Sequence, residues 1–243
     1  MTALAPAKLI VALDVDDLAS ATALVERLAP LGVWFKVGYE PLFRYGDAIR
    51  ARLAERGADV FLDPKLHDIP RTVEAAVRAL VAPGVRILTV HALGGNDMLQ
   101  AAVAGASERA AELGIDAPKI FAVTLLTSIA AEDLNELGLQ GGPGENTMRL
   151  AALARDARCA GVVCSPHEVR DLKAYFGADF ETLCPGIRPA GANRDDQRRV
   201  ATPQAAVEAG ADYLVVGRPI VQAADPVVAA REILAQMEAA RAR

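Results

Sequence analysis

The amino-acid sequence predicts an α/β protein with the architecture of a single (β/α)8 barrel, the TIM barrel, over residues 1–243. Short apolar segments that favour β-strands alternate with longer segments in which apolar residues recur three and four positions apart. This alternation occurs eight times, which is typical of a closed parallel sheet surrounded by helices. The length suits one barrel, and no linker or break in composition divides the chain.

The predicted elements follow one another in a regular order. Strands are expected at residues 9–14, 33–38, 60–63, 87–91, 120–124, 161–164, 182–184 and 213–216. Helices are expected at residues 18–28, 42–56, 72–81, 98–113 and 148–157, and a flexible Gly-Gly-Pro-Gly loop at 141–144. A doubly wound open sheet is the alternative. It has less support because Asp14-Val15-Asp16-Asp17 follows the first strand, where a dinucleotide-binding fold carries glycines.

Composition narrows the classes of function. Hydrophobic residues make up 52% and charged residues 23% of the chain, which indicates a large core under an ordinary charged surface. The net charge of −5 argues against a nucleic-acid partner, because phosphate backbones require a basic field. The longest uncharged apolar stretch, residues 120–131, is too short for a membrane span, and the N-terminus does not have the pattern of a signal peptide. A cytoplasmic protein without a membrane partner is therefore expected.

The three cysteines are expected to be reduced thiols in the core. Cys159, Cys164 and Cys184 are odd in number and lie in apolar contexts. They also lack metal-ligand spacing with any of the histidines. No metal site is predicted from them.

Charged residues are concentrated where the third predicted strand ends, in the stretch Asp63-Pro64-Lys65-Leu66-His67-Asp68-Ile69-Pro70. Side chains two positions apart on a strand share a face, so Asp63 and Lys65 are expected to meet the same ligand. Lys36 lies in the apolar second strand and needs a carboxylate partner, because burying an unpaired ammonium is costly. We expect a network of Lys36, Asp63, Lys65 and Asp68 at the barrel mouth, with Asp14 nearby. The alternative is a structural ion-pair cluster in which Asp68 caps a helix.

The last two strands each run into a glycine and an arginine. Pro185-Gly186-Ile187-Arg188-Pro189 follows the seventh strand, and Val216-Gly217-Arg218-Pro219 ends the eighth. Barrels often bind phosphate at this place, where Gly217 would allow close backbone approach and Arg218 would grip the anion. Gln197, in the connection after the seventh strand, could close the site. Either arginine alone could instead be an ordinary surface residue.

Hydroxyl groups follow the fifth strand at Thr127 and Ser128. They could form hydrogen bonds with a heterocycle or a carboxylate. A helix cap is the alternative, because Thr and Ser are common in that position.

Together these segments resemble the bacterial orotidine 5′-phosphate decarboxylases over nearly the whole chain. The resemblance rests on Asp14, Phe35-Lys36-Val37-Gly38, the stretch from Asp63 to Pro70, Leu126-Thr127-Ser128, Pro185-Gly186-Ile187-Arg188-Pro189, Asp196-Gln197 and Val216-Gly217-Arg218-Pro219, in that order. One departure is Arg71, where relatives often carry asparagine.

The resemblance implies a substrate, orotidine 5′-phosphate, and a role for each site residue. Lys65 would protonate C6 of the pyrimidine, and Asp63 would lie beside the departing carboxylate. Lys36 and Asp14 would bind ribose hydroxyls, and Thr127 would contact the base. Phosphate would be held by Arg188, Gln197, Gly217 and Arg218. The substrate-binding stretch would consist of Asp63, Pro64, Lys65, Leu66, His67, Asp68, Ile69, Pro70, Arg71 and Thr72.

The resemblance also implies a homodimer with a shared active site, in which Asp68, Ile69 and Thr72 reach into the partner's cavity. The implied reaction needs neither a metal nor another cofactor. Two alternatives remain at this point: a magnesium-dependent sugar-phosphate decarboxylase or hexulose-phosphate synthase of the same barrel superfamily, and a non-catalytic nucleotide-binding barrel. Lys65 would be purely structural in the second.

Overall fold

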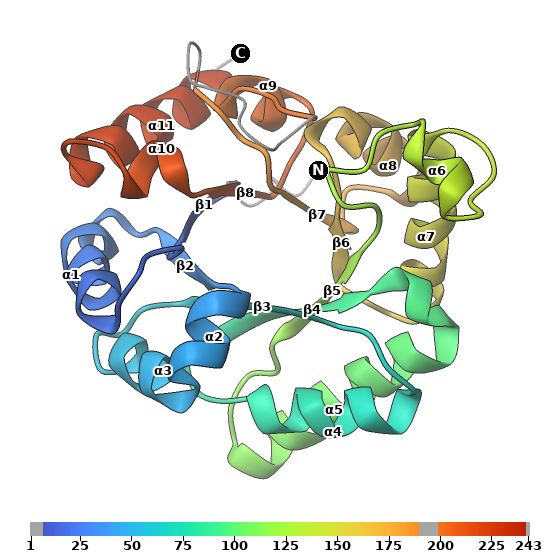
Figure 1. Ribbon diagram of the computed structural model, residues 1–243, viewed down its shortest axis with the longest axis horizontal. Coiled ribbons are helices and arrows are strands. Elements are labelled where there is room, and N and C mark those ends of the chain that lie inside the picture. The colour runs from blue at the N-terminus through green and yellow to red at the C-terminus, as the bar shows by residue number, and fades with distance from the viewer. Residues whose placement is uncertain (1–6, 190–198, 242–243) are drawn as a thin grey trace.

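The computed structural model describes residues 7–189 and 199–241, and its centre is a closed barrel of parallel strands (Figure 1). Each strand pairs with its neighbour in sequence, and the last pairs with the first. The strands are β1 Lys8–Ala12, β2 Trp34–Val37, β3 Val60–Leu66, β4 Val85–His91, β5 Lys119–Val123, β6 Gly161–Val163, β7 Glu181–Cys184 and β8 Tyr213–Val216. The predicted (β/α)8 TIM barrel is thereby confirmed.

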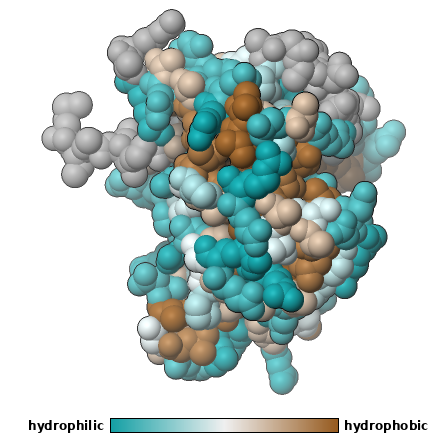
Figure 2. All heavy atoms as spheres, turned by 90° about the vertical axis from the view of Figure 1, so that its left-hand side faces the viewer, coloured by the Kyte–Doolittle hydropathy of each residue, from teal (hydrophilic) through white to brown (hydrophobic). Residues whose placement is uncertain are grey.

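Helices form a ring outside the strands (Figure 1). They are α1 Leu18–Leu28, α2 Tyr39–Tyr45, α3 Asp47–Ala54, α4 Pro70–Leu80, α5 Gly95–Leu113, α6 Asp133–Glu136, α7 Pro143–Asp156, α8 Val169–Phe176, α9 Pro203–Glu208, α10 Arg218–Val221 and α11 Pro226–Arg241. Short 3-10 turns lie at η1 Ala29–Leu31, η2 Ala92–Gly94 and η3 Pro166–Glu168. From the side that carries α1, most of the surface is hydrophilic and hydrophobic residues show only in patches (Figure 2), as amphipathic outer helices require.

Two sequence expectations about helices are wrong. The single helix expected at 42–56 is divided into α2 and α3 by Gly46, whose φ of 50° a helix cannot continue through. The loop expected at 141–144 is partly helical, because α7 already begins at Pro143. Proline suits the first helical turn, and Glu145 accepts a hydrogen bond from the backbone N–H of Gly142 at 2.9 Å.

The apolar side chains form two cores. One lies between the strands and the helices, and the other fills the barrel interior. Interior residues include Ile10, Phe61, Ile87, Phe121 and Tyr213, with Phe121 and Tyr213 packed edge to face. The barrel is therefore packed through its middle, and a ligand can enter only at an end.

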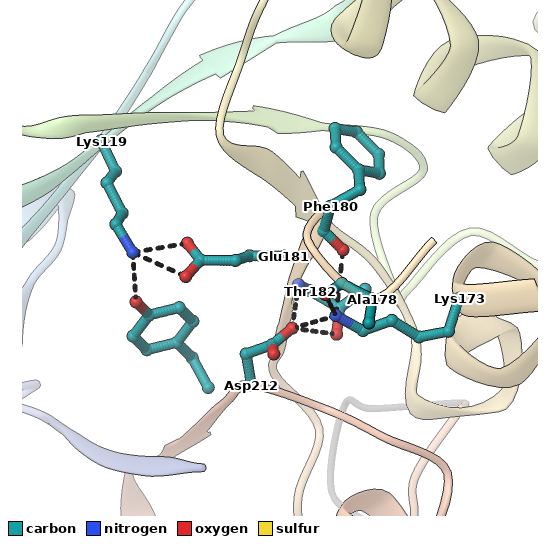
Figure 3. Close-up of polar contacts among 8 residues, drawn as sticks. Lys119, Lys173, Ala178, Phe180, Glu181, Thr182 and Asp212 are labelled. Carbon is teal, nitrogen blue, oxygen red and sulfur yellow. Dashed lines mark hydrogen bonds and ion pairs between the residues drawn. The ribbon is translucent and has the colours of Figure 1, made fainter. Parts of the chain in front are cut away.

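At the amino-terminal ends of the strands, an ion-pair network joins β5, β7 and β8 (Figure 3). Lys119 Nζ contacts both carboxylate oxygens of Glu181 at 2.6 and 2.8 Å and the hydroxyl of Tyr213 at 3.2 Å. Beside it, Asp212 Oδ2 accepts hydrogen bonds from Lys173 Nζ at 2.7 Å and from the backbone N–H of Thr182 at 2.6 Å. These contacts link β5, β7 and β8 at the end of the barrel where the strands begin.

The cysteines agree with expectation. Cys159, Cys164 and Cys184 are buried free thiols, and burial raises the pKa of Cys159 to about 12. Within the described ranges, no helix has the length and apolar character needed to cross a membrane.

Candidate active site

A cavity of about 530 Å³ opens at the carboxyl-terminal ends of the strands. Its polar lining comprises Asp14, Lys36, Asp63, Lys65, Thr127, Ser128, Arg188, Gly217, Arg218 and Gln222. Its floor is apolar and includes Phe61, Val123, Val163, Leu183 and Val215. A cavity of this size, apolar below and polar around the rim, suits a small polar ligand that must be held in one orientation.

One wall carries a chain of alternating charges. Lys65 Nζ lies 2.6 Å from Asp63 Oδ2, and Lys36 Nζ lies 4.0 Å from the same oxygen. Lys36 also contacts Asp14 Oδ1 at 3.2 Å. Asp63 is 7% exposed, and its two cationic neighbours offset the cost of burying its charge.

The β3 strand is irregular where it supplies this pair. Leu62 pairs with Leu88 of β4, but the next pairing joins Leu66 to Val90, so three residues of β3 oppose Thr89 alone. Lys65 has a φ of 42°, in the left-handed region that non-glycine residues rarely adopt. Asp63 and Lys65 therefore come into contact because β3 bulges at these residues. The alternation of side chains along a regular strand does not account for their contact.

Thr89 fills the gap that the bulge creates. Its hydroxyl donates to Asp63 Oδ1 at 2.8 Å and accepts from the backbone N–H of Lys65 at 3.0 Å. The residue is 0% exposed, and β4 supplies no lining residue to the cavity. Thr89 therefore supports the charged wall from behind.

Two neighbours shape the space around the lysines. A Cβ on Gly38 would lie 2.7 Å from Lys36 Nζ, so glycine there leaves room for the ammonium. The ring of Tyr39 lies 5.3 Å from Lys65 Nζ, within range of a cation–π contact. Partial burial and the nearby charge of Asp63 raise the pKa of Tyr39, so its phenol stays neutral at physiological pH.

The opposite wall is formed by the loops after β7 and β8. Arg188 is 8% exposed and donates from Nη1 to the carbonyl of Ile187 at 3.0 Å. Gly217 precedes α10, and a Cβ there would lie 3.4 Å from that of Ala12 and 3.7 Å from Asp14 Oδ2. Arg218 begins the helix and Pro219 lies in its first turn. Both arginines thus border the cavity across from the lysines.

Arg199 ties three strand-end loops together. Its guanidinium pairs with Glu168, which follows β6, and donates to the carbonyls of Leu125 and Leu126, which follow β5, at 3.4 and 3.3 Å. Glu168 also accepts from the backbone N–H of Ser165 at 2.8 Å. Burial raises the pKa of Glu168, and the charge of Arg199 acts in the opposite direction.

The other predicted site residues that the structure describes do not line this cavity. Pro64 is buried and Leu66 is half-buried in β3, whereas residues 67–72 are exposed. Asp68 accepts a hydrogen bond from the backbone N–H of Ile69 at 2.7 Å and borders a separate outward hollow beside Leu93 and Gly94. Gln197 lies outside the described residues. Within one chain, then, the described charge network contains Lys36, Asp63 and Lys65 without Asp68.

Sequence reasoning missed three polar residues of this region: Thr89, Arg199 and Gln222. A signal existed for Thr89, because it is a polar residue in the apolar run Ile87-Leu88-Thr89-Val90-His91. Arg199 and Gln222 offered none, because each follows a strand by several residues and is placed only by the packing of its loop.

The fold and the cavity define a (β/α)8-barrel enzyme. Lys65 is held by the carboxylate of Asp63 at one wall, where it can transfer a proton, and arginines border the other, where they can bind an anion. Such a site can act on a small anionic molecule that spans the mouth of the barrel.

Comparison with known proteins identifies the family. Residues 7–233 match the Orotidine 5'-phosphate decarboxylase / HUMPS family. The orotidine 5′-phosphate decarboxylase of Moorella thermoacetica is 52% identical over 95% of this chain and 92% of its own length. The orotidine 5′-phosphate decarboxylase of Halorhodospira halophila is 49% identical over 97% of this chain and 98% of its own length. The crystal structure of orotidine 5′-phosphate decarboxylase from Lactobacillus acidophilus superposes with a TM-score of 0.84 at 38% identity, covering 95% of this chain and 99% of that one. The chain belongs to this family.

Proposed function

We propose that this protein decarboxylates orotidine 5′-phosphate to uridine 5′-phosphate and CO2, in de novo UMP synthesis in the cytoplasm. The observation that carries the proposal is the Asp63–Lys65 contact of 2.6 Å at one wall of a cavity whose other wall bears Arg188 and Arg218. The names of the relatives and their coverage of the chain support the same assignment.

In the proposed reaction the bond between C6 and the carboxylate breaks, CO2 leaves, and the electron pair stays on C6. That pair lies in the plane of the pyrimidine ring, so the π system cannot delocalise it. A fixed positive charge must stabilise it directly, and we assign this role to the Lys65 ammonium. Lys65 then transfers a proton from Nζ to C6, which gives the product.

The neighbouring charges orient Lys65. Asp63 holds its ammonium, and Lys36 bridges Asp63 and Asp14. Lys36 and Asp14 would bind the ribose hydroxyls, and Thr127 would contact the base. Neither a metal nor another cofactor takes part in this scheme.

Binding of the phosphate supplies energy at a distance from the reacting carbon. Arg188, Gly217 and Arg218 would hold it, together with Gln197. Binding energy gained there can order the loops and exclude water before C–C cleavage begins, which lowers the barrier at C6.

We further propose that two chains form a homodimer in which each supplies Asp68 to the other's cavity, with Ile69 and Thr72 beside it. Asp68 is exposed and borders an outward hollow, and Ile69 is 66% exposed. Leu93, which borders the same hollow, is also exposed, as are Tyr39 beside Lys65 and Phe43 stacked on Tyr39, and a covered surface would require such apolar side chains. A partner's Asp68 would complete the network of four charges expected from the sequence.

Turnover of orotidine 5′-phosphate by the purified protein tests the assignment, and its rate should be unchanged after EDTA treatment. Activity that is lost with EDTA and restored by magnesium would instead favour a sugar-phosphate enzyme of the same superfamily. Absence of turnover in the untreated protein would refute the proposed function.

Lys65→Ala separates an enzyme from a nucleotide-binding barrel. Turnover should be abolished, whereas a uridine monophosphate analogue should still bind, because the arginines of the opposite wall remain. A variant with nearly normal turnover would contradict the role given to Lys65.

Mixing two inactive variants tests the shared site. Lys65→Ala and Asp68→Ala should each be inactive, yet a mixture should recover part of the activity, because a heterodimer contains one site free of both changes. Lack of recovery despite demonstrated subunit exchange would count against the shared site.

A further inference from the structure

We propose that Thr89 is a positioning residue that holds Asp63 and Lys65 in their reactive arrangement, an inference that rests on the proposed function. Its hydroxyl contacts both of these residues in the bulge of β3. Thr89 does not line the cavity, so it acts on the reaction only through them.

The bulge removes the usual support for Lys65. In a regular parallel pair, backbone N–H groups of β3 would donate to backbone carbonyls of β4. Here Pro64 has no N–H, and the N–H of Lys65 donates to the side chain of Thr89 at 3.0 Å. The hydroxyl thus replaces a backbone acceptor at the residue whose φ is 42°.

The same hydroxyl sets the orientation of Asp63. It has one hydrogen to donate, and that hydrogen goes to Asp63 Oδ1 at 2.8 Å. The other oxygen, Oδ2, is then directed toward the two lysines, 2.6 Å from Lys65 Nζ and 4.0 Å from Lys36 Nζ. One buried group therefore determines both the carboxylate rotation and the backbone of the proton donor.

Thr89→Val tests the inference because valine keeps the shape and β-branching of threonine and removes the hydroxyl. We expect kcat for orotidine 5′-phosphate to fall by about 10-fold to 100-fold, because small misplacements of reacting groups cost that much. KM should change by less than about threefold, because the phosphate wall is formed by β7 and β8. Thr89→Ser restores the hydroxyl and should recover most of kcat.

Thr124→Val is the matched control. Thr124 is 1% exposed, and its hydroxyl donates to the carbonyl of Val163 at 2.8 Å at the end of β5. Thr124→Val thus removes a hydroxyl that is as deeply buried as that of Thr89, but one that contacts neither Asp63 nor Lys65. Urea unfolding of both valine variants measures any general loss of stability, and kcat is then compared at a temperature where both are folded.

A second measurement does not depend on turnover. The ¹³Cε signal of Lys65, assigned by its absence in Lys65→Ala, should shift in Thr89→Val and stay in place in Thr124→Val. Positioning is refuted if Thr89→Val keeps kcat within about threefold of the wild type, or if Thr124→Val loses as much. If the wild-type protein shows no turnover, the proposed function is refuted instead. The shift of the Lys65 ¹³Cε signal in Thr89→Val then still decides whether Thr89 positions Asp63 and Lys65.

Discussion

The left-handed backbone of Lys65 has a cost that a pair of variants can measure. Both Lys65→Gly and Lys65→Ala remove the ammonium, but only glycine adopts a φ near 42° without strain. We expect Lys65→Gly to be more stable than Lys65→Ala by about 1 kcal/mol in urea unfolding. Equal stabilities would show that the bulge relaxes once the lysine is removed.

His91, at the end of β4, makes stability depend on pH. Burial lowers the pKa of His91, and the neighbouring His67 and Lys65 lower it further, whereas Asp63 acts in the opposite direction. A lowered pKa means that the folded state favours the neutral ring. The stability that the neutral ring of His91 contributes is fully present above pH 6.5, the pKa of histidine in the unfolded chain. It is lost as the pH falls through the lower pKa of the folded state.

Acidification should therefore destabilise the wild type more than His91→Gln. The free energy of unfolding in urea, measured at about pH 7.5 and about pH 5, gives the comparison. Other titrating groups are common to both proteins and cancel in the difference. The same pH dependence in both would contradict the prediction.

At the scale of elements, the β6–β7 pairing requires glycine at position 161. A Cβ on Gly161 would lie 2.0 Å from the carbonyl oxygen of Glu181 in the neighbouring strand and 2.9 Å from Phe121 Cε1. Both obstacles are in the sheet or the core, so neither can move cheaply. We expect Gly161→Ala to lose at least about 3 kcal/mol of stability.

Gly144→Ala is the corresponding control in an open position. Gly144 lies in the first turn of α7, and apart from its chain neighbours and the backbone of its own helix nothing lies within 4 Å of the Cβ that alanine would add. Gly144→Ala should be neutral or gain up to about 1 kcal/mol, because alanine favours helix. Thermal unfolding of both variants measures the contrast, and a loss in Gly144→Ala as large as in Gly161→Ala would contradict this reading.

At the scale of the whole molecule, the two ends of the barrel have different tasks. The network of Figure 3 lies at the amino-terminal ends of the strands, and the candidate active site lies at the other. Asp212→Ala should cost about 3 kcal/mol, because it removes the carboxylate that pairs with Lys173 and leaves the N–H of Thr182 without its acceptor, although Lys173 keeps the carbonyls of Ala178 and Phe180. In the folded protein kcat should stay close to that of the wild type.

Glu55→Ala is the comparison for Asp212→Ala, because it removes a carboxylate from exposed ion pairs. Glu55 pairs with Arg52 and Arg56, and its side chain is 58% exposed, so its removal should cost less than about 1 kcal/mol. Urea unfolding and steady-state turnover of both variants test the separation. A large fall in kcat for folded Asp212→Ala would mean that the two ends are coupled.

The number of strands and their order could be predicted from the sequence because the apolar periods repeat along the chain, and each period is a local property. The break at Gly46 and the start of α7 at Pro143 were mispredicted. In each case a local conformational effect, the φ of a glycine or the preorganised turn of a proline, outweighed the apolar pattern. Strand ends depend on the neighbouring strand, so their predicted bounds differ from the observed ones by a few residues.

The sequence by itself determined the (β/α)8 barrel and the chemical types at its mouth: a lysine among carboxylates at one strand end and arginines at two others. Only the tertiary structure decided that Thr89 supports Asp63 and Lys65, that Arg199 joins three loops, and that Asp68 faces outward. Apolar periodicity depends on residues that are close together in the chain, so it can be recognised in the sequence. Hydrogen bonds such as that between Thr89 and Asp63 join residues on different strands, and their partners are known only when the strands are in register.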